Sequence, residues 1–277
     1  MTLLEVAPGF CLNIEATGRG RPLVLLHGFT GSARSWSPLV ETLGDGFATY
    51  AVDIVGHGRS EAPAGAEHYG MEAVAADIVG ALARIGVPRA DWLGYSMGGR
   101  TALAVAVLQP QAVERLVLIG ASPGLRTEAE RAARRAADEA LADRILADGV
   151  EAFVDYWESI PLFASQSRLP QAARAAIRTG RLANSATGLA GSLRGMGTGA
   201  QPSFWEALPA LAAPTLLLAG EEDAKYSDLA REMATVLPHA QVRIVPAAGH
   251  AAHLENPGFC ARQIVAFLTN QHAEEPA

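Results

Sequence analysis

Residues 93–100, with the sequence Leu-Gly-Tyr-Ser-Met-Gly-Gly-Arg, decide the fold of this chain. They hold the pattern G-x-S-x-G between a short apolar run and a helical pattern of small residues. Glycines at positions 94 and 98 remove the Cβ atoms that would collide if Ser96 were held in a strained strand-to-helix turn. The helix that follows begins next to Ser96 and offers it free backbone N–H groups. The pattern predicts a nucleophile elbow, against the alternative of a glycine-rich turn with an incidental serine.

The composition around this segment is that of a globular protein with a sizeable core. The chain has 277 residues, of which 49% are hydrophobic, and a formal net charge of −7. This length suits one large α/β domain, with or without an inserted lid. The negative charge argues against nucleic-acid binding. Because the sequence shows no leader and no apolar run of membrane-spanning length, we expect a cytoplasmic protein that binds no membrane.

The two cysteines give no sign of a metal or redox function. Cys11 and Cys260 lie far apart in the sequence and lack the spacing of a metal site or a redox pair. We therefore expect two buried, inert thiols and no metal site.

Apolar runs at regular intervals predict a sheet on both sides of the Ser96 turn. Residues 3–16 alternate apolar and polar positions, and glycines follow at 18 and 20, which predicts an antiparallel edge hairpin. Continuous apolar runs, typical of strands buried on both faces, cover 23–26, 48–53, 92–93, 115–120, 214–219 and 242–245. Helical periodicity covers 71–85 and 252–268. This alternation predicts an α/β fold with a mostly parallel, doubly wound sheet.

The pattern changes between residues 122 and 205, where strand-like runs stop and alanine, arginine and glutamate follow a helical spacing. Pro161, Pro170 and Pro202 divide this block into pieces. Because the block lies between two predicted strands, we expect a helical lid inserted into the sheet domain. We expect a core in two parts, residues 1–121 and 206–270, with the lid at 122–205 between them. Residues 271–277 are expected to form a frayed polar tail.

Ser96, Asp223 and His250 each stand just after the carboxyl end of a predicted strand. In open α/β sheets this edge is where ligands bind. A histidine can take a proton from a serine or a substrate, and an ionised aspartate fixes the tautomer of that histidine. The three residues therefore form a candidate catalytic triad in the order serine, aspartate, histidine. Neighbouring residues of the same types are Glu221, Glu222 and His253.

Over essentially its full length the sequence resembles the α/β-hydrolase superfamily. More narrowly, it resembles the family of 2-succinyl-6-hydroxy-2,4-cyclohexadiene-1-carboxylate synthases of menaquinone biosynthesis. The segments that carry the likeness are 27–32 (HGFTGS), 94–100 (GYSMGGR), 122–125 (SPGL), 155–163 (DYWESIPLF), 220–226 (GEEDAKY) and 249–253 (GHAAH). Many hydrolases share the segments around Ser96 and His250, whereas Arg100, the SPGL segment and the segment around Trp157 are more specific.

The resemblance implies an α/β-hydrolase fold and an elimination rather than a hydrolysis. In that reaction a proton is removed alpha to the succinyl carbonyl of 2-succinyl-5-enolpyruvyl-6-hydroxy-3-cyclohexene-1-carboxylate, and pyruvate leaves as its enol. The relay of Ser96, His250 and Asp223 would be the base. The backbone N–H groups of Phe29 and Met97 would form the oxyanion hole for the enolate oxygen. The resemblance implies no metal and no organic cofactor.

The substrate that the resemblance implies is a small anionic tricarboxylate, and a guanidinium group binds a carboxylate through two hydrogen bonds. By position, Arg100, Arg134 and Arg181 match the carboxylate-binding arginines of the family. Arg178 is a near competitor of Arg181. The other residues that match the substrate pocket are Tyr95, Trp157 and Phe163.

Two histidines outside the triad, His27 and His57, also follow predicted strands and lie among glycines. We interpret His27 as a brace for its loop and His57 as a turn residue satisfied by local hydrogen bonds. Two other functions stay open for the triad itself. It could serve a hydrolase of C–C bonds or carboxylesters, or persist in a non-catalytic binding protein of the same fold. A hydrolase of uncharged esters has no use for three converging guanidinium groups, so the arginines favour the lyase.

Overall fold

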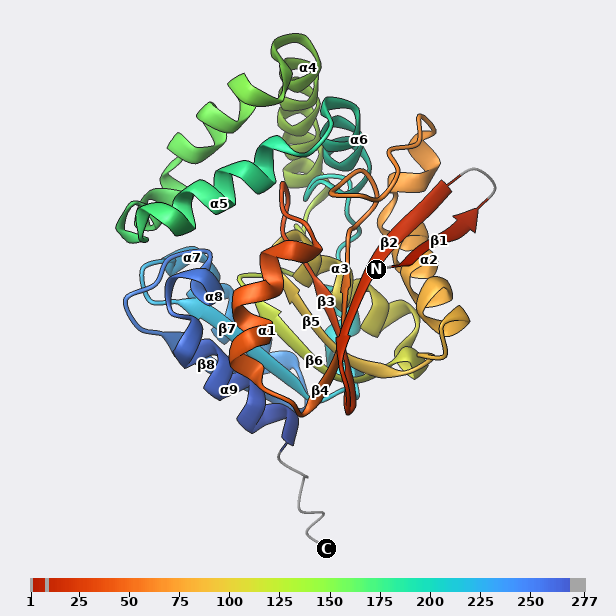
Figure 1. Ribbon diagram of the computed structural model, residues 1–277, viewed down its shortest axis with the longest axis vertical. Coiled ribbons are helices and arrows are strands. Elements are labelled where there is room, and N and C mark those ends of the chain that lie inside the picture. The colour runs from red at the N-terminus through yellow and green to blue at the C-terminus, as the bar shows by residue number, and fades with distance from the viewer. Residues whose placement is uncertain (1, 8–9, 270–277) are drawn as a thin grey trace, which may run out of the picture.

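The computed structural model describes residues 2–7 and 10–269, which form a sheet domain with helices on both faces and a helical layer above one edge (Figure 1). Within these residues eight strands make one sheet in the order β1-β2-β4-β3-β5-β6-β7-β8. The strands are β1 Thr2–Ala7, β2 Phe10–Gly18, β3 Arg21–Leu26, β4 Phe47–Val52, β5 Ala90–Tyr95, β6 Val113–Ile119, β7 Thr215–Gly220 and β8 Ala240–Val245. The predicted α/β class is confirmed.

Strand pairing follows the hydrophobic pattern. The predicted edge hairpin is present, because β1 and β2 pair antiparallel, and β2 also runs antiparallel to β4. From β4 through β3 to β8 all pairs are parallel. All six residues of β7 are buried, as a strand covered on both faces requires. The sheet is therefore mostly parallel, with its antiparallel part at one edge.

Helices cover both faces of the sheet and its carboxyl edge. The α-helices are α1 Ser37–Leu43, α2 Met71–Arg84, α3 Met97–Leu108, α4 Glu128–Ser159, α5 Gln171–Leu182, α6 Ala186–Met196, α7 Ala224–Val236, α8 Ala252–Glu255 and α9 Pro257–Thr269. Short 3-10 helices are η1 Ala33–Trp36, η2 Ala66–Tyr69, η3 Pro110–Ala112, η4 Pro161–Arg168 and η5 Trp205–Ala210. In the described part of the chain, no helix is both long and apolar enough to span a membrane.

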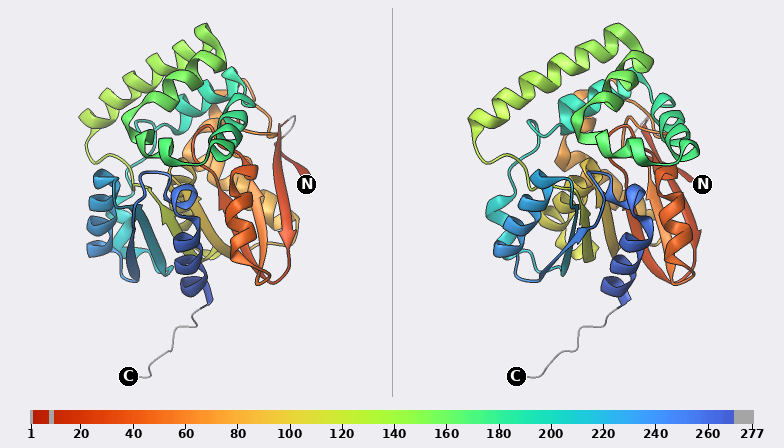
Figure 2. Two further views of the ribbon diagram at one scale, coloured as in Figure 1. Left: turned by 60° about the vertical axis from the view of Figure 1, so that its left-hand side comes forward. Right: turned by 90° about the vertical axis from the view of Figure 1, so that its left-hand side faces the viewer.

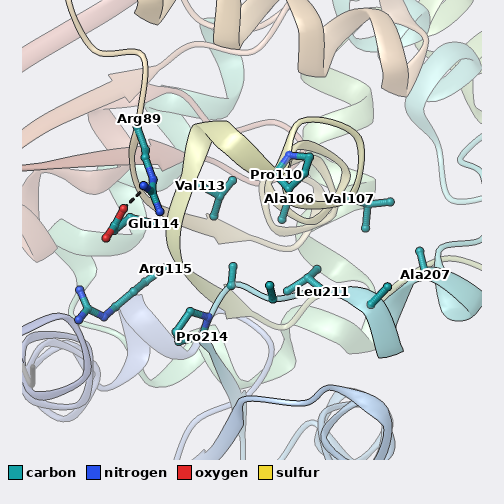
Figure 3. A pocket seen from close by; sticks show the side chains of 13 residues that line it. Arg89, Ala106, Val107, Pro110, Val113, Glu114, Arg115, Ala207, Leu211 and Pro214 are labelled. Carbon is teal, nitrogen blue, oxygen red and sulfur yellow. Dashed lines mark ion pairs between the residues drawn. The ribbon is translucent and has the colours of Figure 1, made fainter. Parts of the chain in front are cut away.

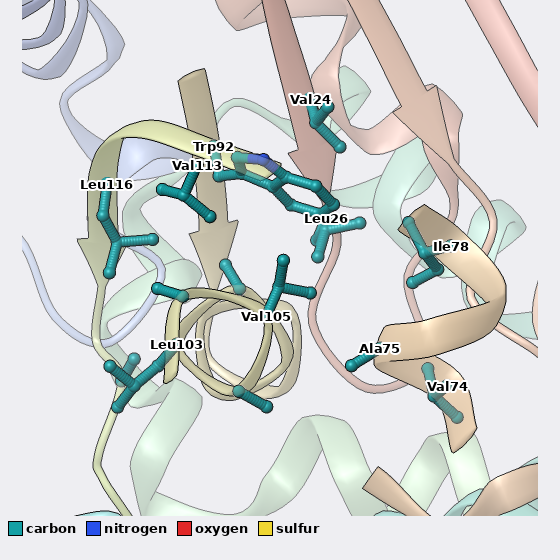
Figure 4. Packing of buried hydrophobic residues seen from close by; sticks show 14 of the residues in the cluster. Val24, Leu26, Val74, Ala75, Ile78, Trp92, Leu103, Val105, Val113 and Leu116 are labelled. Carbon is teal, nitrogen blue, oxygen red and sulfur yellow. The ribbon is translucent and has the colours of Figure 1, made fainter. Parts of the chain in front are cut away.

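Two hydrophobic clusters fix the position of the sheet between its helices. One cluster joins the sheet to α2, α3 and α7, and the other joins it to α1 and α9. Figure 4 shows Trp92 of β5 in the first cluster, above α3, with Val105 and Leu26 next to its ring. The indole Nε1 of Trp92 donates to the carbonyl of Ala112 over 3.0 Å, so this large side chain is buried without an unpaired donor.

The segment between β6 and β7 carries α4, η4, α5 and α6, which lie above the carboxyl edge of the sheet (Figure 2). Thr127 and Glu130 form a capping box at the start of α4. Gly149 interrupts the helical backbone of α4 with φ 82°. These helices share a small apolar cluster of their own, and Phe29 of the core packs against it. We call this helical layer the lid.

Two sequence predictions need correction. The closing helix expected over 252–268 is two helices, α8 and α9, because Pro257 has no backbone N–H and disfavours a helical Asn256 before it. Cys260 is buried as expected, and burial raises the pKa of its thiol to about 12. Cys11, however, is only half-buried. The tail predicted at 271–277 lies outside the described residues.

Candidate active site

The turn at Ser96 has the strained geometry that the glycines predicted. Ser96 adopts φ 50° between the end of β5 and the start of α3. A Cβ on Gly94 would lie 2.2 Å from the carbonyl oxygen of Gly98, and a Cβ on Gly98 would lie 2.0 Å from that of Leu26. Neither position can hold a larger residue without moving backbone. The strained strand-to-helix turn that the nucleophile-elbow pattern predicted is therefore present.

Ser96, His250 and Asp223 meet at the carboxyl edge of the sheet. Nε2 of His250 lies 3.0 Å from Oγ of Ser96, and Nδ1 of His250 lies 2.7 Å from Oδ2 of Asp223. Asp223 follows β7 and caps α7, where its Oδ1 accepts a hydrogen bond from the backbone of Tyr226. With its Nδ1–H donated to Asp223, the imidazole of His250 can accept a proton from Ser96 through Nε2.

The neighbours that could have replaced these groups are engaged elsewhere. Glu221 accepts a hydrogen bond from the backbone of Ala247, and Glu222 forms an ion pair with Arg168. The ring of His253 lies between Trp36 and Tyr95, and burial lowers the pKa of His253 to about 3. Asp223 and His250, rather than Glu221, Glu222 or His253, therefore pair with each other next to Ser96.

His27 and His57 serve the structure of their loops, as their sequence context indicated. Nε2 of His27 accepts a hydrogen bond from the backbone of Ile54 over 3.0 Å. Nδ1 of His57 lies 3.1 Å from the carbonyl of Val55. Burial lowers the pKa of both imidazoles, that of His57 to about 3. Both rings are therefore neutral near pH 7.

The loop after β3 runs directly past Ser96. A Cβ on Gly28 would lie 3.5 Å from the Cβ of Ser96 and 2.7 Å from the ring of Tyr95. Phe29 follows in this loop, and Met97 is the first residue of α3, where amides have no partner within the helix. The Met97 amide thus follows Ser96 directly, and Phe29 lies one residue beyond Gly28 in the loop that passes Ser96. Their role as the oxyanion hole stays a prediction.

Arg100 is buried at the base of the lid. Its Nη1 donates to the carbonyl of Met196 over 2.8 Å and to Oε1 of Gln201 over 2.7 Å. Burial lowers the pKa of Arg100 to about 10, and the positive charge of Arg134 adds to this effect. Arg134 itself is partly exposed and pairs through Nε with Asp138 over 2.8 Å. With a pKa of about 10, Arg100 still carries a positive charge at neutral pH.

Arg181 and Arg178 occupy different environments on α5. The side chain of Arg181 is 8% exposed, and its guanidinium carbon lies 5.1 Å from the ring centre of Phe163. Its Nη1 lies 3.1 Å from Oε1 of Glu158. Arg178 is more exposed, and it pairs with Asp155 and with the other oxygen of Glu158. A cavity of about 470 Å³ in the lid is lined by both arginines.

The ring of Phe163 connects Arg181 to His250. The ring centre of Phe163 lies 6.1 Å from that of His250, and Tyr95 lies 5.3 Å from it. Trp157 contacts Phe163 at 5.6 Å and Phe29 at 5.5 Å. Tyr95 and Phe163 therefore lie beside His250, whereas Trp157 is one ring further away, against Phe163.

Tyr226 is a residue of this site to which the sequence analysis assigned no role. Its ring lies 4.5 Å from that of His250, and burial raises the pKa of its hydroxyl, while Arg100 opposes this rise. The only hint in the sequence is its place three residues after Asp223, in the first turn of the next helix. Tyr226 thus packs beside His250, as Phe163 does between His250 and Arg181.

A further cavity, of about 610 Å³ (Figure 3), lies near the amino ends of β6 and β7, whereas the candidate triad lies at the carboxyl edge of the sheet. Its lining includes Arg89, Glu114, Leu211 and Pro214. Arg89 and Glu114 form an ion pair of 2.7 Å at its rim. None of the predicted site residues lines this cavity.

Comparisons with known proteins agree with the fold. The family model of the alpha/beta hydrolase fold matches residues 21–257. A Bacillus subtilis (strain 168) protein, provisionally named 2-succinyl-6-hydroxy-2,4-cyclohexadiene-1-carboxylate synthase, is 43% identical over 256 residues, 92% of this chain and 93% of its own. The Salmonella schwarzengrund enzyme of that name is 36% identical over 236 residues, 85% of this chain and 88% of its own. The structure of MenH from S. aureus superposes with a TM-score of 0.87 at 34% identity, covering 93% of this chain and 97% of that one.

Proposed function

Because this chain belongs to the α/β-hydrolase fold family, we propose that it uses the triad of that fold in an elimination. The substrate is 2-succinyl-5-enolpyruvyl-6-hydroxy-3-cyclohexene-1-carboxylate, and the products are pyruvate and 2-succinyl-6-hydroxy-2,4-cyclohexadiene-1-carboxylate. This is a step of menaquinone or phylloquinone biosynthesis. The names of the two bacterial relatives support the reaction, and the site supports its chemistry.

The first step is removal of a ring proton by the relay. Oγ of Ser96 takes the proton alpha to the succinyl carbonyl and passes its own proton to Nε2 of His250, 3.0 Å away. Asp223 stabilises the resulting imidazolium through Nδ1. The amides of Phe29 and Met97 hold the developing enolate oxygen, since preorganised donors stabilise charge that forms in the transition state.

The second step is departure of the leaving group. The electron pair of the enolate forms a new ring double bond, the existing double bond shifts by one position, and the C–O bond to the enolpyruvyl group breaks. Pyruvate leaves as its enolate, which accepts a proton and becomes pyruvate. The ring gains one double bond with no net oxidation or reduction, so the balance needs no redox partner.

The observation that carries this proposal is the pair of buried arginines, Arg100 and Arg181, near the candidate triad. The backbone N–H of Arg100 donates to the carbonyl of Ser96 over 2.9 Å. Arg181 lies over Phe163, whose ring is 6.1 Å from that of His250. A guanidinium that is poorly solvated gains more from pairing with a carboxylate than one in water does. Together with Arg134, these groups match the three carboxylates of the substrate.

The test is release of pyruvate from the enolpyruvyl substrate, followed by coupled reduction of pyruvate to lactate. The proposal expects turnover that saturates with substrate. Hydrolysis of p-nitrophenyl acetate is measured in parallel. Rapid ester cleavage without pyruvate release would contradict the lyase function.

The second candidate function is hydrolysis of carboxylesters or C–C bonds. It is favoured by one observation, the 3.0 Å separation of Ser96 Oγ and His250 Nε2, which also suits attack of Ser96 on a carbonyl. An acyl-enzyme on Ser96, detected by mass spectrometry after a short incubation with the ester, would support this candidate. The lyase forms no such adduct with its own substrate.

A further inference from the structure

Asn184 of the lid contacts two core loops at once. It lies between α5 and α6 and is only 6% exposed. Its Nδ2 donates to the carbonyl of Thr30 over 2.8 Å. Its Oδ1 accepts from the backbone N–H of Gly58 over 3.1 Å. One buried amide therefore connects the lid to the loop after β3 and to the loop after β4.

The orientation of this amide is fixed by its surroundings. Nδ2 also lies 3.1 Å from the carbonyl of Arg181 and 3.3 Å from that of Gly180. Three carbonyls thus face the NH₂ group, and a backbone N–H faces the oxygen. Aspartate could replace only the acceptor, since an ionised carboxylate donates no hydrogen bond.

The loop that Asn184 contacts has a strained backbone next to Phe29. Thr30 is buried and has φ 67°, a left-handed conformation that a β-branched residue rarely adopts. Such a conformation persists only where the surrounding structure holds it. The bond from Asn184 acts on the carbonyl of Thr30, one residue from the amide of Phe29.

We propose that Asn184 is a positioning residue for the oxyanion hole, which holds the backbone of Thr30 so that the Phe29 amide points at the oxygen of the reacting carbonyl. The hold exists only while the lid is seated on the core. Because Arg181 lies three residues before Asn184, one lid segment carries both a candidate carboxylate-binding arginine and the contact to the Thr30 loop. The proposal rests on the role of Phe29 in the proposed function.

The test compares Asn184→Asp and Asn184→Ala with the neighbouring Ser185→Ala. Ser185 caps α6 by accepting a hydrogen bond from Gly188 over 3.0 Å, so its loss weakens the lid without touching the Thr30 loop. We expect kcat of pyruvate release to fall about 10- to 100-fold in both Asn184 variants, because small misplacements of a catalytic group cost about that much. KM should change less than about 3-fold, and Ser185→Ala should keep the kcat of the unmodified protein.

A second measurement does not depend on activity. Amide hydrogen exchange of a peptide covering residues 27–33 should accelerate in Asn184→Asp and stay unchanged in Ser185→Ala. Unchanged exchange in Asn184→Asp, or an equal fall of kcat in Ser185→Ala, would overturn the proposal. If the unmodified protein releases no pyruvate, the proposed function fails. The kcat for p-nitrophenyl acetate, which uses the same amides, and the exchange data then decide the role of Asn184.

Discussion

Nη1 of Arg100 lies 2.7 Å from Oε1 of Gln201, so an arginine of the core helix α3 is tied to the chain that leaves the lid. Gln201 is fully buried, and the same Nη1 also donates to the carbonyl at the end of α6. The guanidinium of Arg100 is therefore oriented by the lid itself. A group held in this way loses little rotational freedom when it binds a carboxylate.

Substitution of Arg100 should weaken transition-state binding. Arg100→Ala should lower kcat/KM for pyruvate release by an amount that corresponds to a loss of about 2–5 kcal/mol in transition-state stabilisation, because it removes one partner of a desolvated charge pair. Arg100→Lys should recover only part of the loss, since an ammonium lacks the planar fork that binds two carboxylate oxygens. Arg231→Ala, on the exposed face of α7, is the control. An unchanged kcat/KM in Arg100→Ala would remove Arg100 from the site.

Arg181 and Arg178 should differ in their effect. Arg181→Ala removes the buried guanidinium over Phe163, and kcat/KM should fall roughly 30-fold or more. Arg178→Ala removes a partly exposed pair with Asp155 and Glu158, and the loss should stay below about 5-fold. Steady-state kinetics of the two variants decide the matter. A larger loss in Arg178→Ala would reverse the assignment.

The relay predicts large losses of kcat when its members change. Ser96→Ala removes the group that takes the substrate proton, and kcat should fall at least about 1,000-fold. Asp223→Asn should give a loss on the order of 10⁴, because an amide beside Nδ1 selects the wrong tautomer of His250. Pyruvate release measures both, and circular dichroism checks that both variants fold. Ser96→Ala with full activity would exclude the relay as the base.

Two glycine substitutions should change stability in opposite directions. Gly98→Ala places a Cβ 2.0 Å from the carbonyl of Leu26 and should destabilise the protein by more than about 2 kcal/mol. Gly80→Ala, on the exposed side of α2 with no atom within 4 Å of the new Cβ, should stabilise it by about 0.5–1 kcal/mol. Denaturant unfolding measures both. If Gly98→Ala were as stable as the unmodified protein, the Ser96 turn would tolerate a larger residue.

Acid should destabilise the folded chain through its buried histidines. Burial lowers the pKa of His57 and His253 from 6.5 to about 3, so the unfolded state binds more protons between these values. Stability contributed by the neutral rings is present above pH 6.5 and lost as pH falls toward 3, at about 1.4 kcal/mol per pH unit and histidine.

The matched variants are His253→Phe and His239→Gln. His253→Phe keeps an aromatic ring between Trp36 and Tyr95 but binds no proton, so the pH slope of unfolding free energy should fall by one proton. His239 is exposed, so His239→Gln removes a histidine without disturbing the packed core. A slope in His253→Phe equal to that of the unmodified chain would show that His253 takes up no proton on unfolding.

The sequence alone was sufficient to predict that the three candidate triad residues follow the carboxyl ends of strands. It was also sufficient to predict the strained turn at Ser96. Steric exclusion around Gly94 and Gly98 is a local property, and apolar runs reveal strands buried on both faces wherever they lie. Because the carboxyl ends of parallel strands meet at one edge, the positions of Ser96, Asp223 and His250 after their strands were enough to predict that they meet.

Only the tertiary structure decided which side chains complete the site. Arg178 and Arg181 lie three residues apart on one helix, and their burial depends on how α5 packs against Glu158 and Phe163. The contacts of Asn184 with Thr30 and Gly58 span more than a hundred residues, and no local pattern encodes them. Helical periodicity and turn chemistry act over a few residues, whereas the fit of a lid on a sheet depends on the packing of the whole chain.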